Sequence, residues 1–335
     1  MAKFFLSLIS AALLAWEFYG AAPPRLDLFG LDASLPYAVF AAPPSVSPAR
    51  YGETPPDILA IITPSAPRIG VEPGMSDEEG PPPADGQNAA EPAEITLTPG
   101  NGASFLKSGG VVIHNETKIN VDMDKVMARK LTIGLPSADK PQILIVHTHG
   151  HESYFGGGGV IEIGERLAEL LTAQGFNVIH DRARYDEPSF SGAYSSALTG
   201  ITKTLKENPG IQVVIDVHRD SIRGADGSVK KPVTMVGDKK AAQMMFVVGT
   251  NNSGLPHSGW PHNLAFAVAL QKSLVSETPE LMRPINLRRE RFNQHTTAGS
   301  LILEVGAQGN SFGEALYSIE LFAESASGVL KGLVK

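Results

Sequence analysis

Ile143-Leu-Ile-Val-His-Thr-His-Gly-His-Glu-Ser-Tyr154 joins a short apolar run directly to three histidines and a glutamate. The run from Ile143 to Val146 is rich in β-branched residues, which is typical of a strand buried on both faces of a sheet. The polar residues would then leave the carboxyl end of that strand, the edge where ligands bind in open α/β sheets. His149 and Glu152 are spaced so that an imidazole and a carboxylate from one turn can meet at one cation. The stretch therefore predicts a metal site at a sheet edge.

Two other strands carry polar residues that suit the same site. The segment 211–220 is a hydrophobic strand that ends in His218, and 300–306 is an apolar strand that contains Glu304. Two histidines, a carboxylate and an open fourth position are the usual catalytic zinc arrangement, in which the bound water reaches a pKa of about 7. An unpaired carboxylate inside an apolar strand costs several kcal/mol and so needs a partner or a function. We predict Zn²⁺ ligands at His149, Glu152 and His218, with Glu304 as the catalytic base.

Alternatives exist for each of these assignments. His147 ends the strand directly and could replace His149, whereas His151 is expected to face solvent or substrate. Glu162 and Glu165, on the helix that follows, could replace Glu152. Glu304 could instead be a buried ion-pair partner of an arginine such as Arg219 or Arg291.

Strand and helix patterns alternate through the C-terminal two thirds of the chain. Helices are expected at 123–129, 160–174, 193–207 and 260–276, strands at 176–179 and 244–249, and a terminal helix that opens with a capping box at Ser311-Phe-Gly-Glu314. This alternation predicts an α/β fold with a mainly parallel, mixed sheet that is flanked by helices on both faces.

The chain divides into three predicted parts. Residues 1–20 form a short apolar segment that is expected to anchor the chain in a membrane or to serve as a cleaved export signal, and 21–108 form a proline-rich, largely disordered spacer. Residues 109–335 form the predicted catalytic domain. The chain has no cysteine, which excludes a thiolate zinc site, and its net charge of −7 argues against nucleic acid as a partner.

Four motifs together resemble the stage II sporulation protein P family over about Gly110 to Lys335. The motifs are His147-Thr-His-x-x-Glu-Ser-Tyr154, Asp216-x-His-Arg-Asp220, Asn293-Gln-His295 and Glu304-Val-Gly-x-x-x-Asn310. The resemblance implies a cell-wall hydrolase similar to zinc N-acetylmuramoyl-L-alanine amidases, with an added endopeptidase activity and an amidase/phosphorylase-hydrolase-like fold. In the broader amidase class the glutamate ligand lies further along the chain, which keeps Glu162 and Glu165 open as ligands.

The same resemblance implies a biological setting. Its substrate would be peptidoglycan, and its partner a sporulation lytic transglycosylase of the stage II sporulation protein D type, acting during engulfment with the catalytic domain outside the cytoplasmic membrane. Arg219, Arg291, Asn293 and His295 would then bind substrate, because peptidoglycan stems carry carboxylates that suit arginine. Two other functions remain open: a carboxypeptidase-like metallopeptidase acting on protein, and a non-catalytic wall-binding scaffold.

Overall fold

The computed structural model describes residues 90–188 and 190–335. The predicted anchor at 1–20 and most of the predicted spacer lie outside the described residues. No helix in the described ranges is long and apolar enough to cross a membrane.

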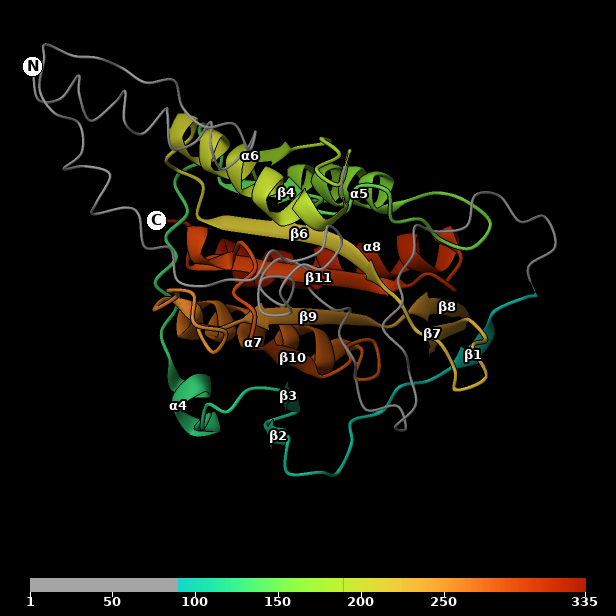
Figure 1. Ribbon diagram of the computed structural model, residues 1–335. Coiled ribbons are helices and arrows are strands. Elements are labelled where there is room, and N and C mark those ends of the chain that lie inside the picture. Colours follow the sequence, from blue (N-terminus) through green and yellow to red (C-terminus); the bar gives the residue numbers. More distant parts are fainter. Residues whose placement is uncertain (1–89, 189) are drawn as a thin grey trace, which may run out of the picture. The chain divides into compact units, whose positions relative to one another are not determined.

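An eight-stranded sheet forms the centre of the described chain, in the order β2-β3-β10-β9-β11-β6-β4-β5 (Figure 1). Its strands are β2 (Phe105–Ser108), β3 (Val111–Asn115), β4 (Ile143–Val146), β5 (Val178–His180), β6 (Val213–Asp220), β9 (Met244–Gly249), β10 (Ile285–Arg288) and β11 (Gly299–Ala307). Strands β5, β4, β6 and β11 run parallel to one another. Strand β9 lies antiparallel to β11, and β10 and β3 continue parallel to β9. The predicted mainly parallel, mixed α/β sheet is confirmed.

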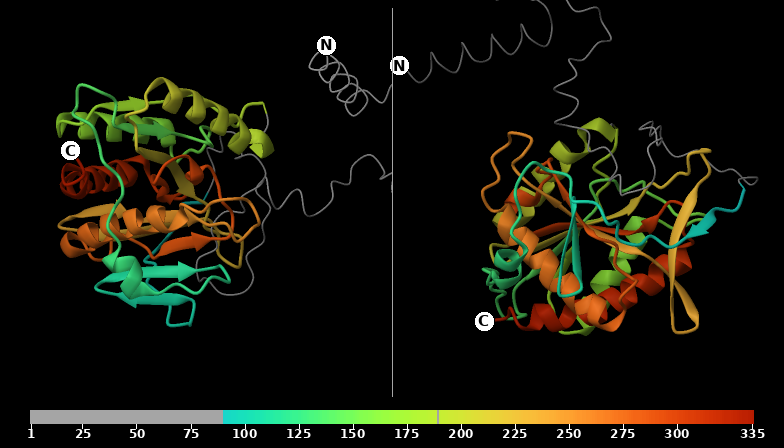
Figure 2. Two further views of the ribbon diagram at one scale, coloured as in Figure 1. Left: turned by 90° about the vertical axis from the view of Figure 1, so that its left-hand side faces the viewer. Right: turned by 90° about the horizontal axis from the view of Figure 1, so that it is seen from below.

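Helices cover both faces of this sheet, as predicted. They are α4 (Met123–Ala128), α5 (Val160–Ala173), α6 (Ala193–Glu207), α7 (Trp260–Glu277) and α8 (Phe312–Lys331), with short 3₁₀ turns η1 (Phe190–Gly192) and η2 (Gln294–Thr296). Helices α5, α7 and α8 pack on one face, and α6 lies on the other over β4 and β6 (Figure 2). Strand alternation explains the two layers: Ile143 and Ile145 join the large core, and Leu144 and Val146 pack against α6.

Local sequence signals account for the ends of several elements. The capping box that opens α8 is confirmed, because Ser311 accepts a hydrogen bond from the Glu314 amide and its own amide donates to the Glu314 carboxylate. Gly109 and Gly110 join β2 to β3 with φ angles of 55° and 82°, the left-handed conformation that a tight hairpin turn requires.

A second, three-stranded sheet lies beside the first, in the order β1-β7-β8. It consists of β1 (Ala93–Ile95), β7 (Lys230–Val236) and β8 (Lys239–Ala242). Lys231 holds it to the domain, with its ammonium 3.1 Å from Glu94 and 3.2 Å from Glu314 of α8. The ordered fold thus takes in β1 and β2, which the sequence analysis assigned to the spacer. Short strands such as these become ordered because they pair with strands far along the chain.

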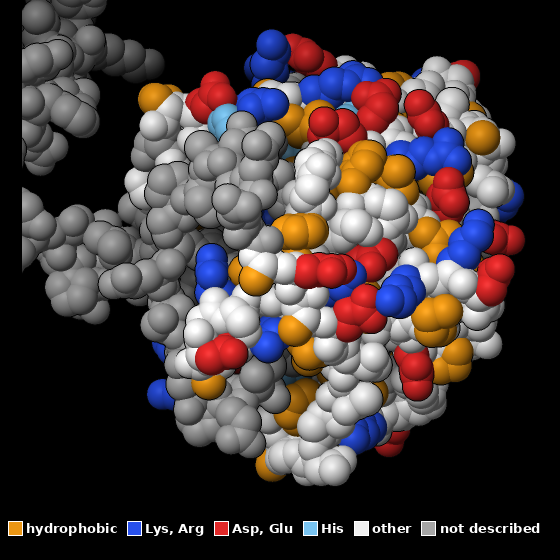
Figure 3. All heavy atoms as spheres, turned by 90° about the vertical axis from the view of Figure 1, so that its right-hand side faces the viewer, with side chains coloured by type: hydrophobic (Ala, Val, Ile, Leu, Met, Phe, Trp, Pro, Cys, Tyr) orange, Lys and Arg blue, Asp and Glu red, His pale blue; other side chains and the backbone are white. Residues whose placement is uncertain are grey.

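The face of the molecule drawn in Figure 3 carries both acidic and basic side chains. Figure 3 shows acidic and basic side chains interspersed among the described residues of the face turned toward the viewer, with no large patch of one sign. Ion pairs such as Lys240 with Glu94, 2.6 Å apart, illustrate this mixing. A continuous basic surface for nucleic acid is therefore lacking among the described residues of that face.

Candidate functional site

Three adjacent strands bring the predicted ligands and the predicted base together. His149 and Glu152 lie on the turn that leaves β4, His218 lies on β6 and Glu304 on β11, which are neighbours in the sheet. The rings of His149 and His218 are 5.4 Å apart between centroids, and Glu152 Oε2 lies 3.4 Å from His218 Nδ1. Glu304 is paired in register with His218, so the two side chains point to the same face of the sheet.

His218 lies between two carboxylates. Its Nδ1 faces Glu152, and its Nε2 lies 3.0 Å from Asp216 Oδ1, although without the alignment of a hydrogen bond. Burial lowers the pKa of His218, but Asp216 and Glu152 outweigh that effect and hold the pKa well above its ordinary value. In the absence of another cation, the imidazole therefore carries the positive charge that the two buried carboxylates need.

Asp216 is a site residue to which the sequence analysis gave no role. Its carboxylate accepts hydrogen bonds from the amide and the hydroxyl of Thr148, at 2.8 and 2.5 Å. Burial raises the pKa of Asp216, but His218 and the Thr148 hydrogen bonds lower it below the ordinary value. The signal that could have found it is its spacing: a carboxylate two positions before His218 in a strand points to the same face.

His149 is held among aromatic rings. It stacks on Phe190 with 4.0 Å between ring centroids and meets Tyr194 edge-on at 5.5 Å. Burial and the nearby charge of His218 lower the pKa of His149 to about 4, so the ring is neutral. Its Nδ1 is buried and has no hydrogen-bond partner among the described residues. A neutral imidazole with an unused nitrogen is the form that binds a metal.

Glu152 is held by a hydrogen bond from the backbone of β6. Its Oε2 accepts a hydrogen bond of 3.0 Å from the Arg219 amide. Burial raises the pKa of Glu152, but His218 and Arg219 lower it below the ordinary value, so the carboxylate is ionised. The Arg219 side chain, predicted to bind substrate, donates to the Ser153 carbonyl and so braces the same turn.

Glu304 is buried and unpaired. It is 5% exposed, and its Oε2 has no hydrogen-bond partner among the described residues. Burial raises the pKa of Glu304 well above the ordinary value, and the nearby carboxylates of Asp220 and Glu152 add to the effect. An ion pair with Arg219 or Arg291 is not found in the described structure. A fully buried ion pair nearby joins Arg283 to Asp220, with 2.7 Å between the charged atoms.

The alternative ligands are engaged elsewhere. His147 approaches the Val217 carbonyl at 3.0 Å through Nδ1 and His180 at 2.8 Å through Nε2, so both ring nitrogens are occupied. Glu165 pairs with Arg182 and lies 3.4 Å from His180, and Glu162 is exposed on the first turn of α5. Of the carboxylates considered as ligands, Glu152 is the one that faces His218. His151 is also held by a carboxylate, with its Nδ1 2.9 Å from Asp186.

The side chains predicted to bind substrate on the loop between β10 and β11 make contacts in two different places. Asn293 donates to the Tyr194 carbonyl at 2.9 Å, and thereby ties the loop to the start of α6 beside His149. Arg291 donates to the Pro256 carbonyl at 3.3 Å, and His295 lies near His257, so these two side chains face the loop before α7.

The donor set fits a zinc ion in part. Two ligands of a tetrahedral site with bonds of about 2.0–2.1 Å lie roughly 3.3–3.4 Å apart, which matches the distance of 3.4 Å from His218 Nδ1 to Glu152 Oε2. Asp216 on the far nitrogen of His218 is the outer carboxylate typical of zinc histidines. No group of three His, Cys, Asp or Glu in the described ranges is already arranged to hold a metal ion. His149 Nδ1, which has no hydrogen-bond partner among the described residues, is a nitrogen free to act as a third ligand.

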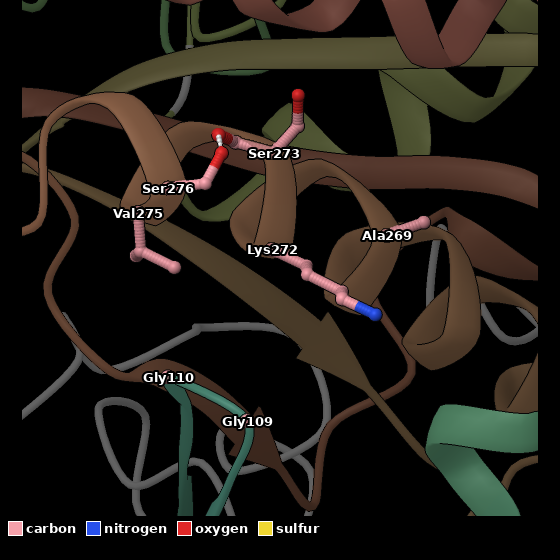
Figure 4. A pocket seen from close by; sticks show the side chains of 7 residues that line it. All are labelled: Gly109, Gly110, Ala269, Lys272, Ser273, Val275 and Ser276. Atoms are coloured by element: carbon pink, nitrogen blue, oxygen red, sulfur yellow. Dashed lines mark hydrogen bonds between the residues drawn. The ribbon is translucent and has the colours of Figure 1, made fainter.

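A hollow of about 480 Å³ lies away from these residues, between the Gly109–Gly110 turn and α7 (Figure 4). Lys272, Ser273 and Val275 line it, together with Ala269 and Ser276. None of the predicted site residues contributes to its lining, so it belongs to a different face of the sheet.

The family model described as stage II sporulation protein P (SpoIIP) matches residues 102–327. The chain belongs to the SpoIIP family. A curated relative, stage II sporulation protein P of Bacillus subtilis (strain 168), is 25% identical over 203 residues, which are 53% of this chain and 48% of that protein. The chain thus matches about half the length of that SpoIIP relative.

Solved structures of N-acetylmuramoyl-L-alanine amidases are also similar to this SpoIIP-family chain. AmiC2 of Nostoc punctiforme is 15% identical with a TM-score of 0.37, covering 59% of this chain and 98% of that one. Ami1 of Mycobacterium smegmatis is 11% identical with a TM-score of 0.38, covering 61% and 100%.

Proposed function

We propose that the chain is a zinc-dependent peptidoglycan hydrolase that cleaves an amide bond, as an N-acetylmuramoyl-L-alanine amidase with a further stem-peptide endopeptidase activity. The observation that carries the proposal is Glu304, a buried carboxyl group that has no hydrogen-bond partner among the described residues and points to the same sheet face as His218. A group left in that state is costly to the fold unless it serves a reaction. Membership of the SpoIIP family supports the same function.

Each side chain has a defined role in this proposal. His149, Glu152 and His218 would hold Zn²⁺, which when bound acidifies a water molecule and polarises the scissile carbonyl. Asp216 orients the His218 ring and keeps its Nδ1 turned toward Glu152. Glu304 takes a proton from the attacking water and returns it to the leaving amine. The raised pKa of Glu304 suits its role as base, because a carboxylate with a higher pKa accepts a proton from water more readily than an ordinary glutamate.

The setting of the reaction is part of the same proposal. Residues 1–20 would anchor the chain in the membrane or direct its export, and the proline-rich segment would let the domain reach the wall. A sporulation lytic transglycosylase is the proposed partner, acting with this enzyme during engulfment. These assignments follow from the sequence and from the family.

The decisive experiment compares the full chain with its Glu304→Gln variant on purified sacculi. The amide keeps the shape of the side chain but cannot accept the proton, so release of soluble products should fall by roughly 100-fold or more. Zinc content should stay at the wild-type level, because Glu304 is not a proposed ligand. Mass analysis of the products identifies the bond: whole stem peptides indicate an amidase and cut cross-links an endopeptidase.

The matched control is Glu162→Gln, which changes an exposed glutamate near the site and should leave product release unchanged. The proposal is wrong if Glu304→Gln digests sacculi as the wild type does, or if wild-type activity survives complete removal of zinc by a chelator.

A further inference from the structure

Three basic side chains lie near one another on the two loops that follow β9 and β10. Arg291 and His295 come from the loop between β10 and β11, and His257 comes from the loop before α7. Arg291 Nη1 donates to the carbonyl of Pro256, the residue before His257, at 3.3 Å. The rings of His257 and His295 are 6.4 Å apart between centroids and nearly perpendicular. We call His257, Arg291 and His295 the basic cluster.

The loop that carries the basic cluster is firmly held. Gln294 donates to the Val247 carbonyl and accepts from the Gly249 amide, both at 2.8 Å, which pins the loop to β9. A Cβ on Gly249 would lie 2.4 Å from the Glu290 carbonyl oxygen, so only glycine permits this close approach. Phe292, between Arg291 and Asn293, has a φ of 51°, a conformation rare for a bulky residue. Strained and over-determined segments of this kind occur where a site must be preorganised.

The cluster has donors without acceptors. His257 is 3% exposed, and its Nε2 is buried without a partner among the described residues. Arg291 Nε is likewise buried, and no described residue pairs with it. In the described ranges no carboxylate lies within ion-pair distance of any of the three. The guanidinium itself is only partly buried, but Arg291 Nε and His257 Nε2 are buried polar atoms without partners among the described residues, a state that an incoming hydrogen-bond acceptor would relieve.

Electrostatics agrees with the geometry. Burial, together with the neighbouring His295 and Arg291, lowers the pKa of His257 to about 4. Burial also lowers the pKa of Arg291 and, together with Arg291, that of His295. Burial thus lowers the pKa of all three groups, basic neighbours add to the effect for the two histidines, and no acidic group contributes to the shift of any of them. The ligand that would complement the cluster is a negatively charged hydrogen-bond acceptor.

The cluster is connected to the candidate site through aromatic contacts. The Phe292 ring lies 5.6 Å from Tyr194, and the Tyr194 ring lies 5.5 Å from His149. Asn293 donates a hydrogen bond to the Tyr194 carbonyl, which joins the loop to the start of α6. These contacts join the loop that carries Arg291 and His295 to the aromatic residues around His149.

We propose that His257, Arg291 and His295 form a carboxylate-binding site that recognises a free carboxylate of the peptide stem. The assignment to a stem peptide rests on the proposed function, whereas the carboxylate chemistry rests on the cluster. Arg291 Nε and the Nε2 of His257, in the tautomer with hydrogen on that nitrogen, donate to the two oxygens. His295 closes the site at its exposed rim. Asn293, predicted from sequence to share this role, holds Tyr194 instead.

The test measures binding by titration calorimetry in the full chain carrying Glu304→Gln, so that no probe is consumed. The two probes are a muramyl peptide whose stem ends in a free carboxylate and the same peptide with a terminal amide. The acid should bind roughly 10-fold more tightly than the amide, because charged hydrogen bonds exceed neutral ones. Adding Arg291→Gln or His257→Gln should remove that difference and leave amide binding unchanged.

Arg289→Gln is the matched control, since Arg289 lies in the same loop but is exposed, and it should preserve the difference. The inference is overturned if Arg291→Gln and His257→Gln bind the acid as tightly as their parent, or if they weaken acid and amide equally. Stronger competition by inorganic phosphate than by acetate would overturn the carboxylate assignment. Sacculi left intact by the wild type would overturn the proposed hydrolysis alone, because the preference for the acid does not depend on cleavage.

Discussion

At the scale of single residues, the site depends on how buried charges are compensated. Asp216 and Glu152 share the charge of His218, and Asp220 is paired with Arg283, whereas Glu304 has no partner in the part of the chain that the structure describes. Asp216, Glu152 and Asp220 each have a positive partner, and Glu304 is the carboxyl group left available for reaction. A histidine at a strand end, considered alone, does not reveal which of these cases applies.

The Arg283–Asp220 pair provides a prediction of stability. Replacing Arg283 by Met leaves the Asp220 carboxylate buried without its counter-ion, so the free energy of unfolding should fall by about 3–5 kcal/mol. Urea denaturation measures the change. The control is Arg166→Met, which breaks the exposed pair with Glu320 and should cost less than about 1 kcal/mol. Equal losses in the two variants would contradict this account.

At the scale of elements, α5 and β4 fit together through a glycine and two histidines. A Cβ on Gly164 of α5 would lie 2.5 Å from His147 Nε2 and 2.9 Å from His180 Nε2. The bare glycine therefore leaves room for the contact between His147 and His180, which fixes the turn that carries His149. A helix glycine usually lowers stability, and here it is kept for packing.

Gly164→Ala should accordingly destabilise the protein by about 1–3 kcal/mol, since the added methyl group overpacks the histidine pair. The matched control is Gly328→Ala in α8, where a Cβ meets nothing within 4 Å. That control should gain roughly 0.5–1 kcal/mol from helix propensity. Denaturation curves of both variants decide the matter, and a stabilised Gly164→Ala protein would refute the packing argument.

At the scale of the whole molecule, the sheet order decides which strand ends can cooperate. Strand β11 lies between β6, which runs parallel to it, and β9, which runs antiparallel. That reversal places the loop after β10 beside the start of β11, where it carries the basic cluster. The two proposed sites are thus consequences of one strand arrangement.

Stability of the whole fold should depend on pH through His257. Its pKa is about 4 in the folded protein against 6.5 in the unfolded chain, so acid protonates the unfolded chain first. Stability therefore falls as the pH decreases from about 6.5 toward 4, by roughly 1–2 kcal/mol between pH 7 and 5 for this residue. Urea denaturation at pH 7 and pH 5 measures this loss of unfolding free energy. The loss should be smaller in His257→Gln than in the wild type by roughly 1–2 kcal/mol. Identical losses would show that His257 does not titrate in this way.

The sequence by itself determined the α/β class, the helices α5, α6 and α7 to within a few residues, and the four residues His149, Glu152, His218 and Glu304 that the fold brings together. These follow from apolar periodicity, turn residues and polar groups at strand ends, which are properties of neighbouring positions. Whether those residues bind zinc and catalyse hydrolysis stays a prediction.

Only the tertiary structure decided the strand order, the reversal at β9, the role of Asp216 and the engagement of His147 with His180. It also brought together His257 and His295, which are far apart along the chain. Such contacts depend on how the whole chain packs and on which strands pair, and no local pattern encodes them. The same physical cause explains the short strands β1 and β2, which become ordered by pairing with distant partners.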